Sequence, residues 1–350
     1  MKRTEGDGDS GVGVAAPAGG PPPPGYRALV EGCALAAPPP ASWLELTGED
    51  GARFLHGQVT CDVQGLAPGH GVYGFLLSPK GRVLADAVIS AEAERLRVEL
   101  PSGVAAEAAD RLRRYVVADR VEIRSPEPQD GLLAAGPGAA ELLRPLLGGD
   151  PPSGWGHAEG AIDGSPVTVR CERRLGVPAW RLRGPGPAIE SASGALRRAG
   201  AVAAGEEALE AIRVERGLPR AGVDFDDRHF PQETGLEEWA VSYTKGCYVG
   251  QEVVARIHYR GRANHQLRGL RALAETTAPA TGPLVDAGGE DSGRLTSSVW
   301  SSAVGAAIGL AVLHRHQAEP GTRLFTAGGA ELEVVALPFV EPMSGQDSDR

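Results

Sequence analysis

The feature that most constrains the fold is a series of short apolar segments with the two-residue period of β-strands, interrupted by a few helical patterns. Between residues 43 and 124, strands are predicted at 43–46, 72–77, 82–89, 96–100 and 120–124, and amphipathic helices at 51–59 and 105–116. Strands joined by short turns form hairpins, and hairpins mixed with helices are typical of layered α+β domains. The pattern favours α+β architecture over a doubly wound parallel sheet.

The rest of the chain divides into a second mixed unit and a β-rich end. Strands are predicted at 132–135, 167–170 and 179–183, and helices at 139–147, 189–199 and 206–216. After about residue 266 only strand patterns remain, at 267–273, 294–299, 306–313, 323–326 and 331–337, separated by turn residues. Short strands in this arrangement predict a small barrel.

These patterns predict a multidomain chain with a tail at each end. The first 25 residues are rich in Gly and Pro and hold almost no large apolar side chain, so they cannot offset the entropy of ordering. A length of 350 residues suits two or three packed units. The predicted parts are a disordered tail (1–25), a first α+β domain (26–129 plus 205–262), a second α+β domain (130–204), a C-terminal β-barrel domain (263–340) and a tail (341–350).

Composition argues against several classes of protein. A net charge of -10 does not suit a general nucleic-acid binder, which usually has a basic surface. Neither a run of about 18 apolar residues nor a signal-peptide pattern is present, so we expect a cytoplasmic protein without membrane contact. The four cysteines (Cys33, Cys61, Cys171 and Cys247) stand far apart, so neither a metal site nor a disulfide framework is predicted.

Lysine is rare in this chain. Thirty-two arginines stand against three lysines, at positions 2, 80 and 245. An ammonium group is a compact charge, whereas guanidinium is a broad planar fork, so Lys80 and Lys245 mark positions where arginine would not serve. The alternative is that lysine has been retained there by chance.

The densest motif is Lys-Gly-Cys-Tyr-Val-Gly-Gln-Glu, from Lys245 to Glu252. Gly246 and Gly250 permit a tight turn before a helix, which would place Cys247 near the helix N-terminus with Lys245 beside it. That environment favours the thiolate, which can act as a nucleophile, a redox group or a contact to a metal cluster. The alternative is a buried, inert cysteine with glycines that serve packing.

This motif, followed by Tyr259-Arg-Gly261, resembles the signature of the YgfZ family of tetrahydrofolate-binding proteins, which are similar in fold to the glycine cleavage T-protein, an aminomethyltransferase. The resemblance extends from about residue 26 to 340. It implies a three-domain aminomethyltransferase-like fold around a central folate cavity. The first α+β domain would be the folate-binding domain. The other matching segments are Leu46-Thr-Gly-Glu-Asp50, the stretch from Phe54 to Asp62, Leu77-Ser-Pro-Lys-Gly-Arg82, Ile212-Arg-Val-Glu-Arg-Gly217 and Leu337-Pro-Phe339.

The resemblance also implies roles for single residues. Glu215 occupies the place of the T-protein glutamate that holds the pterin ring, and a carboxylate suits the donor edge of a pterin. Asp86 corresponds to an Asp-Asp pair that assists transfer at the folate nitrogen, but Ala85 leaves only one acid here. Without the family, Glu215 would be interpreted as a solvent-facing charge.

The remaining folate contacts are expected around the motif. Tyr248 and Gln251 are candidates within it, and Arg256, Arg260 and Arg268 are candidates for the glutamate tail, because guanidinium binds carboxylates in a bidentate manner. Solvated surface arginines are the alternative.

The function implied by the resemblance is that of a folate-dependent accessory protein in iron–sulfur cluster assembly or repair. Cys247 and Lys245 would supply the chemical step, assisted by Asp86. The partners implied are folate and iron–sulfur client or assembly proteins, including radical enzymes that modify tRNA. Two alternatives remain, namely a folate-dependent aminomethyltransferase or demethylase, and a non-catalytic folate-sensing scaffold in which Cys247 is structural.

Overall fold

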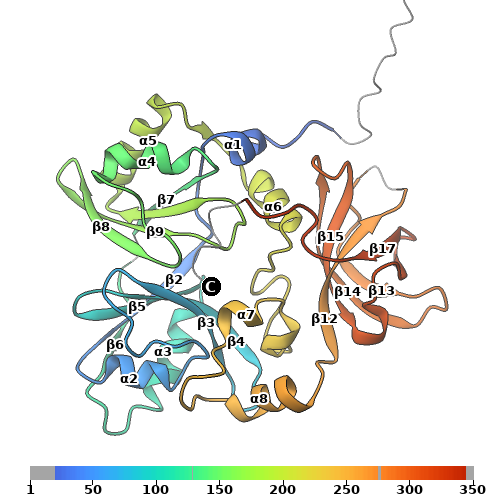
Figure 1. Ribbon diagram of the computed structural model, residues 1–350, viewed down its shortest axis with the longest axis horizontal. Helices are drawn as coiled ribbons and strands as arrows, with labels where there is room; N and C mark the ends of the chain where they lie inside the picture. The colour runs from blue at the N-terminus through green and yellow to red at the C-terminus, as the bar shows by residue number, and fades with distance from the viewer. Residues whose placement is uncertain (1–19, 128, 275–276, 344–350) are drawn as a thin grey trace, which may run out of the picture.

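The computed structural model describes residues 20–127, 129–274 and 277–343, which form three lobes (Figure 1). The first lobe is built on a five-stranded sheet whose helix-side core includes Leu44, Leu55 and Val98. In sheet order its strands are β3 (Gly71–Leu77), β4 (Val83–Ala91), β5 (Arg95–Pro101), β2 (Ala41–Thr47) and β6 (Glu122–Arg124). Helices α2 (Gly51–His56) and α3 (Ala105–Arg113) cover one face of the sheet.

The second lobe is built on a six-stranded sheet covered on one face by α4 (Ala139–Leu147) and α5 (Gly186–Arg198). Its strands, in sheet order, are β11 (Val202–Ala203), β1 (Ala34–Ala36), β7 (Asp130–Ala135), β10 (Ala179–Gly184), β9 (Ser165–Cys171) and β8 (His157–Ile162). Strand β1 pairs with β7 and β11, although residues 34–36 were assigned to the first domain from the sequence. Register with a distant strand determines this placement, and local sequence does not encode it.

The two sheets face each other through charged and aromatic side chains. Because successive strand residues point to opposite faces, Leu44 and Val98 point toward the helices, whereas Trp43 and Glu99 point toward the second sheet. Arg181 and Arg183 of β10 meet them from the other side. Buried charges require partners, so this layer is where a functional site is most readily built.

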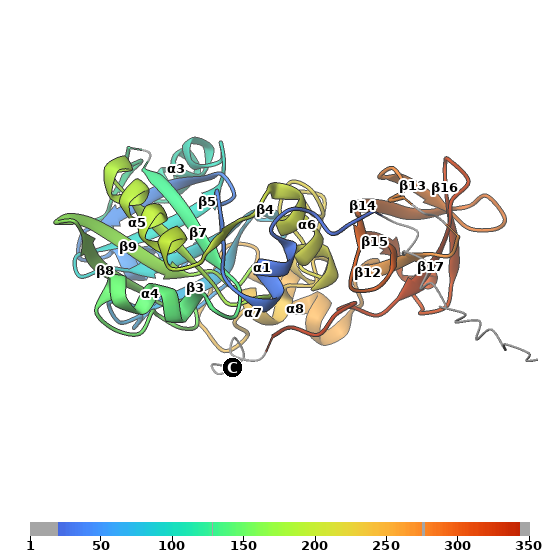
Figure 2. The same ribbon diagram turned by 90° about the horizontal axis from the view of Figure 1, so that it is seen from above.

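The third lobe is a closed six-stranded barrel at one end of the molecule, separated from the two sheets by helices (Figure 2). In barrel order its strands are β12 (His265–Ala272), β15 (Ala306–His314), β14 (Asp291–Ser301), β13 (Gly282–Val285), β16 (Arg323–Thr326) and β17 (Glu331–Val335). The predicted α+β class and C-terminal barrel are confirmed.

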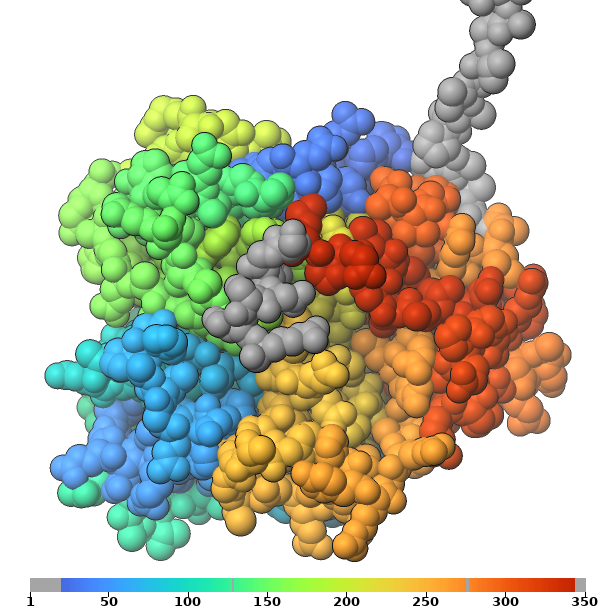
Figure 3. All heavy atoms as spheres, viewed as in Figure 1, coloured from blue at the N-terminus to red at the C-terminus, as the bar shows by residue number. Residues whose placement is uncertain are grey.

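A group of short helices from two parts of the chain lies between the lobes. It comprises α1 (Tyr26–Glu31), α6 (Glu206–Glu215), the 3-10 turn η1 (Pro231–Glu233), α7 (Glu237–Ala240) and α8 (Gln251–Arg260). In the space-filling view the gold and orange surface of α7 and α8 lies between the blue first lobe and the red barrel (Figure 3). Among residues 20–127, 129–274 and 277–343, every helix is too short or too polar to span a lipid bilayer. Of the predicted tails, 1–25 and 341–350, residues 1–19 and 344–350 lie outside the described residues.

Several elements were not expected from the sequence. Helix α1 and strands β1, β8 and β13 lie in segments for which no element was predicted, because Gly, Pro and short length hide their period. Strand β8, for example, has four exposed residues between its buried ends, so it shows no apolar alternation. Pairing with neighbouring strands, and not local propensity, determines the three strands, and α1 packs through Tyr26 and Leu29 in a buried cluster.

Candidate functional site

Asp86 lies on β4 in the layer between the two sheets. It is 6% exposed, and its Oδ2 accepts a hydrogen bond of 3.0 Å from the hydroxyl of Tyr73. Its Oδ1 has no hydrogen-bond partner among the described residues. Burial raises the pKa of Asp86, and Arg174, 3.9 Å from Oδ2, only partly opposes this. The group is therefore a buried carboxyl with one free acceptor and a readiness to hold a proton.

Aromatic rings form a wall beside Asp86. Tyr73 stacks on Trp155 with 5.2 Å between ring centroids, and Trp239 meets Trp155 edge-on at 6.1 Å. The guanidinium of Arg173 lies 5.6 Å from the centre of Trp155 and 5.4 Å from that of Trp239. Arg173 is 7% exposed, and its Nε has no hydrogen-bond partner in the described chain. A carboxyl acceptor, a cation and aromatic faces thus converge on one place.

A network of charges positions the arginine nearest Asp86. Arg174 contacts both Glu99 and Glu172, and Arg170 and Arg181 also pair with Glu99. Burial raises the pKa of Glu99, but the surrounding arginines more than offset it and lower that pKa to about 2. The carboxylates remain charged and hold Arg174 in place.

Glu215, the last residue of α6, lies where the helices meet the barrel. It is 0% exposed, and its carboxylate accepts hydrogen bonds from Tyr26 of α1 (2.8 Å) and Ser301 of β14 (2.6 Å). Its backbone carbonyl accepts from the amides of Phe339 and Val340. The carboxylate is therefore buried and bridges separate elements, unlike a solvent-facing charge on an amphipathic helix.

A loop connects the surroundings of Asp86 with those of Glu215. Arg173 and Arg174 lie on the segment 172–177 between β9 and β10. Gly176 in this loop packs so closely on Arg216 that a Cβ atom placed there would lie 2.5 Å from the arginine Cγ. The loop 172–177 thus contacts Asp86 through Arg174 and the neighbour of Glu215, Arg216, through Gly176.

Lys245 is turned into the protein. Its Nζ donates three hydrogen bonds, to the carbonyls of His56 (2.6 Å), Val59 (2.7 Å) and Cys61 (2.7 Å). It is 9% exposed, and burial lowers its pKa to about 8. All three ammonium donors are satisfied, so the structure explains why this position requires a lysine. Lys80, by contrast, is exposed in the β3–β4 turn, and nothing in the structure explains a need for lysine there.

The loop after Lys245 packs on the β3–β4 turn. Gly250, the N-cap of α8, has φ 85°, and a Cβ atom there would lie 2.6 Å from the carbonyl oxygen of Ser78. The amide of Val249 donates to the carbonyl of Gly57. The two sequence motifs 54–62 and 245–252 are therefore in direct contact.

Cys247 lies at the outer side of this loop. It is exposed, whereas Cys33, Cys61 and Cys171 are buried. The alternative of a buried packing cysteine is therefore excluded. Its neighbour Gly246 lies near His56, since a Cβ atom on Gly246 would be 3.7 Å from the ring Nε2. The other ring nitrogen of His56 is 3.2 Å from Asp62 Oδ1.

The other candidate residues are dispersed. Tyr248 is buried, and the centre of its ring lies 5.1 Å from Nζ of Lys245. Gln251 is half-buried at the start of α8. Arg256 and Arg260 are exposed on α8. Arg268 lies in a cleft of about 400 Å³ between α8 and β12, where its guanidinium donates to the carbonyls of Ala318 and Leu267 and to Gln266.

Family models match almost all of the folded chain. The GCVT N-terminal domain matches residues 26–245, and the glycine cleavage T-protein C-terminal barrel domain matches residues 265–341. The chain belongs to the glycine cleavage T-protein family. This membership confirms the resemblance inferred from the motifs. Residues 246–264, which include Cys247, lie outside both matched ranges.

Comparison with individual proteins agrees with this assignment. The chain is 29% identical over 316 residues to a putative chloroplastic transferase of Arabidopsis thaliana, covering 87% of this chain and 71% of that protein. It is 28% identical to the tRNA-modifying protein YgfZ of Hamiltonella defensa (62% and 64% covered). In fold it matches the aminomethyltransferase of Bartonella henselae with a TM-score of 0.81 at 21% identity, covering 91% of this chain and 89% of that one.

Sequence reasoning did not anticipate the wall beside Asp86. Tyr73, Trp155, Trp239 and Arg173 come from separate segments, and no local motif marks them. The available signal was composition, since only 5% of residues are aromatic and five are tryptophans. Two of the five lie together at this site.

Proposed function

We propose that this protein binds tetrahydrofolate, or a one-carbon derivative of it, beside Asp86, and that it serves iron–sulfur cluster assembly or repair through the Cys247 loop. The observation that carries the folate proposal is the free Oδ1 of Asp86 next to the wall of Tyr73, Trp155 and Trp239. Membership of the T-protein family supports it.

The chemistry of this place suits a folate. A pterin is a flat ring with donors along its 2-amino and N3 edge, so it can stack on an aromatic face while a carboxylate accepts from that edge. Arg173 adds a buried cation for a ring carbonyl or a carboxylate of the tail. Few sites combine an aromatic stacking face with a buried carboxylate and a buried cation. The surroundings of Asp86 are therefore favoured as the folate site over the exposed arginines of α8.

Glu215 is proposed as the second contact to the pterin, as the resemblance implies. Each oxygen of its carboxylate already accepts one hydrogen bond, and a carboxylate has about four acceptor positions. A ligand edge could therefore be bound without displacing Tyr26 or Ser301. The alternative role for Glu215 is to bridge α1, α6 and the barrel without touching a ligand.

Calorimetric titration with tetrahydrofolate tests the folate proposal. We expect binding to the unmodified protein and at least a tenfold loss with Asp86→Asn, Arg173→Met and Glu215→Gln. Arg124→Met, on the exposed edge strand β6, is the control and should bind normally. Absence of binding to the unmodified protein would remove folate altogether. Loss in Asp86→Asn and Arg173→Met alone would leave Glu215 with only its bridging role.

Complementation tests the role of Cys247. In a strain that lacks this protein, Cys247→Ala and Cys247→Ser should fail to restore the activity of iron–sulfur enzymes, while Thr244→Ala in the same loop should restore it. Both cysteine variants should fold, because Cys247 is exposed. Full rescue by either one would contradict a role for the thiol and favour the folate-sensing scaffold.

A folate-dependent aminomethyltransferase is the second candidate. On sequence grounds, the lack of a second acid beside Asp86 argues against a working aminomethyltransferase, because the resemblance implies an Asp-Asp pair there. Ala85, however, packs in the core on the helix side of the sheet, whereas Asp86 faces the second sheet. An acid at 85 would not share the face of Asp86, so that argument loses its force. Formation of methylenetetrahydrofolate from a protein-bound aminomethyl donor, abolished by Asp86→Asn, would favour this activity.

A further inference from the structure

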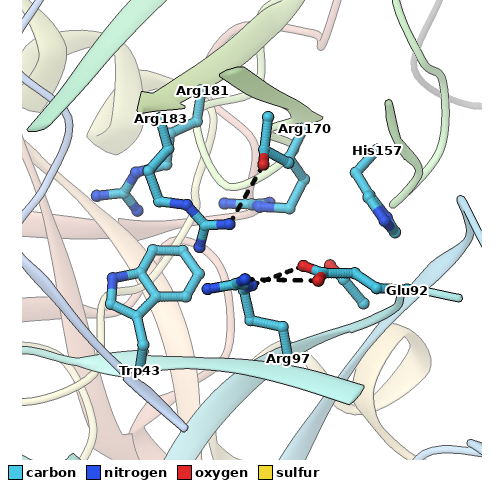
Figure 4. Close-up of a pocket in the computed structure, with 9 residues that line it drawn as sticks. Trp43, Glu92, Arg97, His157, Arg170, Arg181 and Arg183 are labelled. Atoms are coloured by element: carbon cyan, nitrogen blue, oxygen red, sulfur yellow. Dashed lines mark hydrogen bonds and ion pairs between the residues drawn. The ribbon is translucent and has the colours of Figure 1, made fainter. Parts of the chain in front are cut away.

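A second cavity lies in the layer between the sheets, with Arg183 at its wall (Figure 4). Arg183 is 7% exposed, and its guanidinium stacks on the ring of Trp43 at 4.4 Å. Its one side-chain hydrogen bond in the described chain is a long contact of 3.4 Å to Thr168. No described carboxylate lies within 4 Å of it, so Arg183 is a buried cation without an ion-pair partner.

The other arginines of this cavity already have their anions. Arg97 pairs with Glu92 at 2.6 Å and with Glu45 at 2.9 Å. Arg170 and Arg181 pair with Glu99 at 3.1 and 2.8 Å. These carboxylates are therefore engaged by other arginines, and none of them forms an ion pair with Arg183. Burial, followed by repulsion from Arg97, lowers the pKa of Arg183 to about 10, and the more distant charges of Glu92 and Glu99 only partly oppose this.

The unmet polar atoms around the cavity are mainly donors. The Nε atoms of Arg170 and Arg183 are buried without a hydrogen-bond partner, and each carries a hydrogen that only an acceptor can satisfy. Nδ1 of His157 is also buried and unpartnered, and it too can donate. A buried donor without an acceptor costs about 1–3 kcal/mol, so three such atoms around one cavity indicate a missing ligand that accepts hydrogen bonds.

We propose that this cavity, lined by Arg183, Arg170, His157, Thr168 and Trp43, is a binding site for one compact anion, distinct from the Asp86 site. The cavity measures about 20 Å³, which is space for one or two water-sized groups. It therefore suits a halide or the two oxygens of a carboxylate group. The anion would neutralise Arg183 on β10 and link it to Arg170 on β9 and His157 on β8.

Stability measurements with defined anions test this site in the full chain. Thermal unfolding is followed in a chloride-free buffer at constant ionic strength, while chloride or acetate replaces bulky gluconate. We expect a saturable rise of the unfolding midpoint with at least one of these probes, because a ligand that binds only the folded state stabilises it. A response to chloride alone identifies a halide site, and one to acetate identifies a carboxylate site.

Variants separate the site from general salt effects. Arg183→Met retains bulk but removes the charge, and it should lose the saturable response. Arg183→Lys retains a charge without the fork and should respond with at least threefold weaker affinity. Arg124→Met, whose arginine is exposed on β6, should respond as the unmodified protein does. The proposal is overturned if no anion gives a saturable effect, or if Arg183→Met and Arg183→Lys both respond like the unmodified chain.

Discussion

At the scale of single residues, the positions that stand out are buried polar groups whose contacts differ from what their motifs suggested. Lys245 was expected beside a reactive thiol, but its ammonium is bound to three carbonyls of the segment 56–61. Asp86 was expected near folate and proves to be a buried carboxyl with a free oxygen. Such groups are costly to bury. Substitution should therefore lower stability where the group has all its hydrogen-bond partners, as Lys245 does, and raise it where a partner is missing, as for Asp86.

For Lys245, removal of the ammonium should destabilise the fold. Lys245→Met leaves three carbonyls without their donor, so we expect the free energy of unfolding to fall by about 2–4 kcal/mol. Lys245→Arg should also destabilise, because a planar fork cannot replace a point donor surrounded by three acceptors. Urea unfolding measures both variants. Lys80→Arg, at an exposed turn, is the control, and an equal loss there would contradict the explanation.

For Asp86, removal of the charge should stabilise the protein, and the gain should depend on pH. Its pKa is raised in the folded state, so the folded chain holds the proton more tightly than the unfolded chain. That contribution is present below the unfolded pKa of about 4 and is lost as pH rises through the folded pKa. We expect Asp86→Asn to be more stable by about 1–2 kcal/mol at pH 7.

Thermal unfolding between pH 4 and pH 8 checks this prediction. The advantage of Asp86→Asn over the unmodified protein should shrink as pH falls toward 4. Asp62→Asn, at an exposed carboxylate, serves as the control. An advantage that stays constant with pH would show that the raised pKa is not its source.

At the scale of elements, the Cys247 loop is held in place by close packing of two turns. Gly250 lies against Ser78 in the β3–β4 turn, and Gly81 of that turn lies against Val253 of α8. Both glycines have positive φ, which side chains rarely adopt. The backbone of the loop is therefore fixed from both sides, while the thiol of Cys247 stays exposed. Such a loop presents a group on a rigid support.

The two glycines of the motif should respond differently to alanine. Gly250→Ala introduces both a strained φ and a clash with the Ser78 carbonyl, so we expect a loss of about 1–3 kcal/mol. Gly246→Ala meets only an ordinary contact with His56 and should cost less than about 1 kcal/mol. Chemical denaturation compares them, and similar losses at both positions would mean that the packing of the turns is not what requires glycine.

At the scale of the whole molecule, buried polar contacts join the barrel to the rest. Asp224 accepts hydrogen bonds from Thr296 (2.6 Å) and Ser297 (2.7 Å) of β14 and pairs with Arg213 of α6 (2.7 Å). Glu215 makes a similar link to Ser301. The orientation of the barrel relative to the sheets thus depends on a few charged groups and not on a broad apolar interface alone.

Loss of the Asp224 link should loosen the barrel. Asp224→Ala leaves Arg213 as a buried cation with a weaker set of partners, so we expect a loss of about 3–5 kcal/mol. Limited proteolysis should then cut in the linker near residue 263 and release the barrel faster than in the unmodified protein. Asp291→Ala removes an exposed carboxylate of the barrel and should change neither quantity appreciably.

Local pattern was sufficient for much of this protein. Strand periods and turn residues predicted the α+β class, the barrel and most of the long elements, because alternation and helical spacing reflect which side chains are buried. The motif from Lys245 to Glu252 indicated the family by resemblance, and its two glycines predicted a turn before a helix.

Only the tertiary structure decided which side chains meet. The wall of Tyr73, Trp155 and Trp239, the free oxygen of Asp86 and the unpaired Arg183 come from strands and loops that are distant in sequence. It also turned Lys245 inward and left Cys247 outside. Long-range register and packing between sheets determine such contacts, and these depend on the whole chain rather than on any local window.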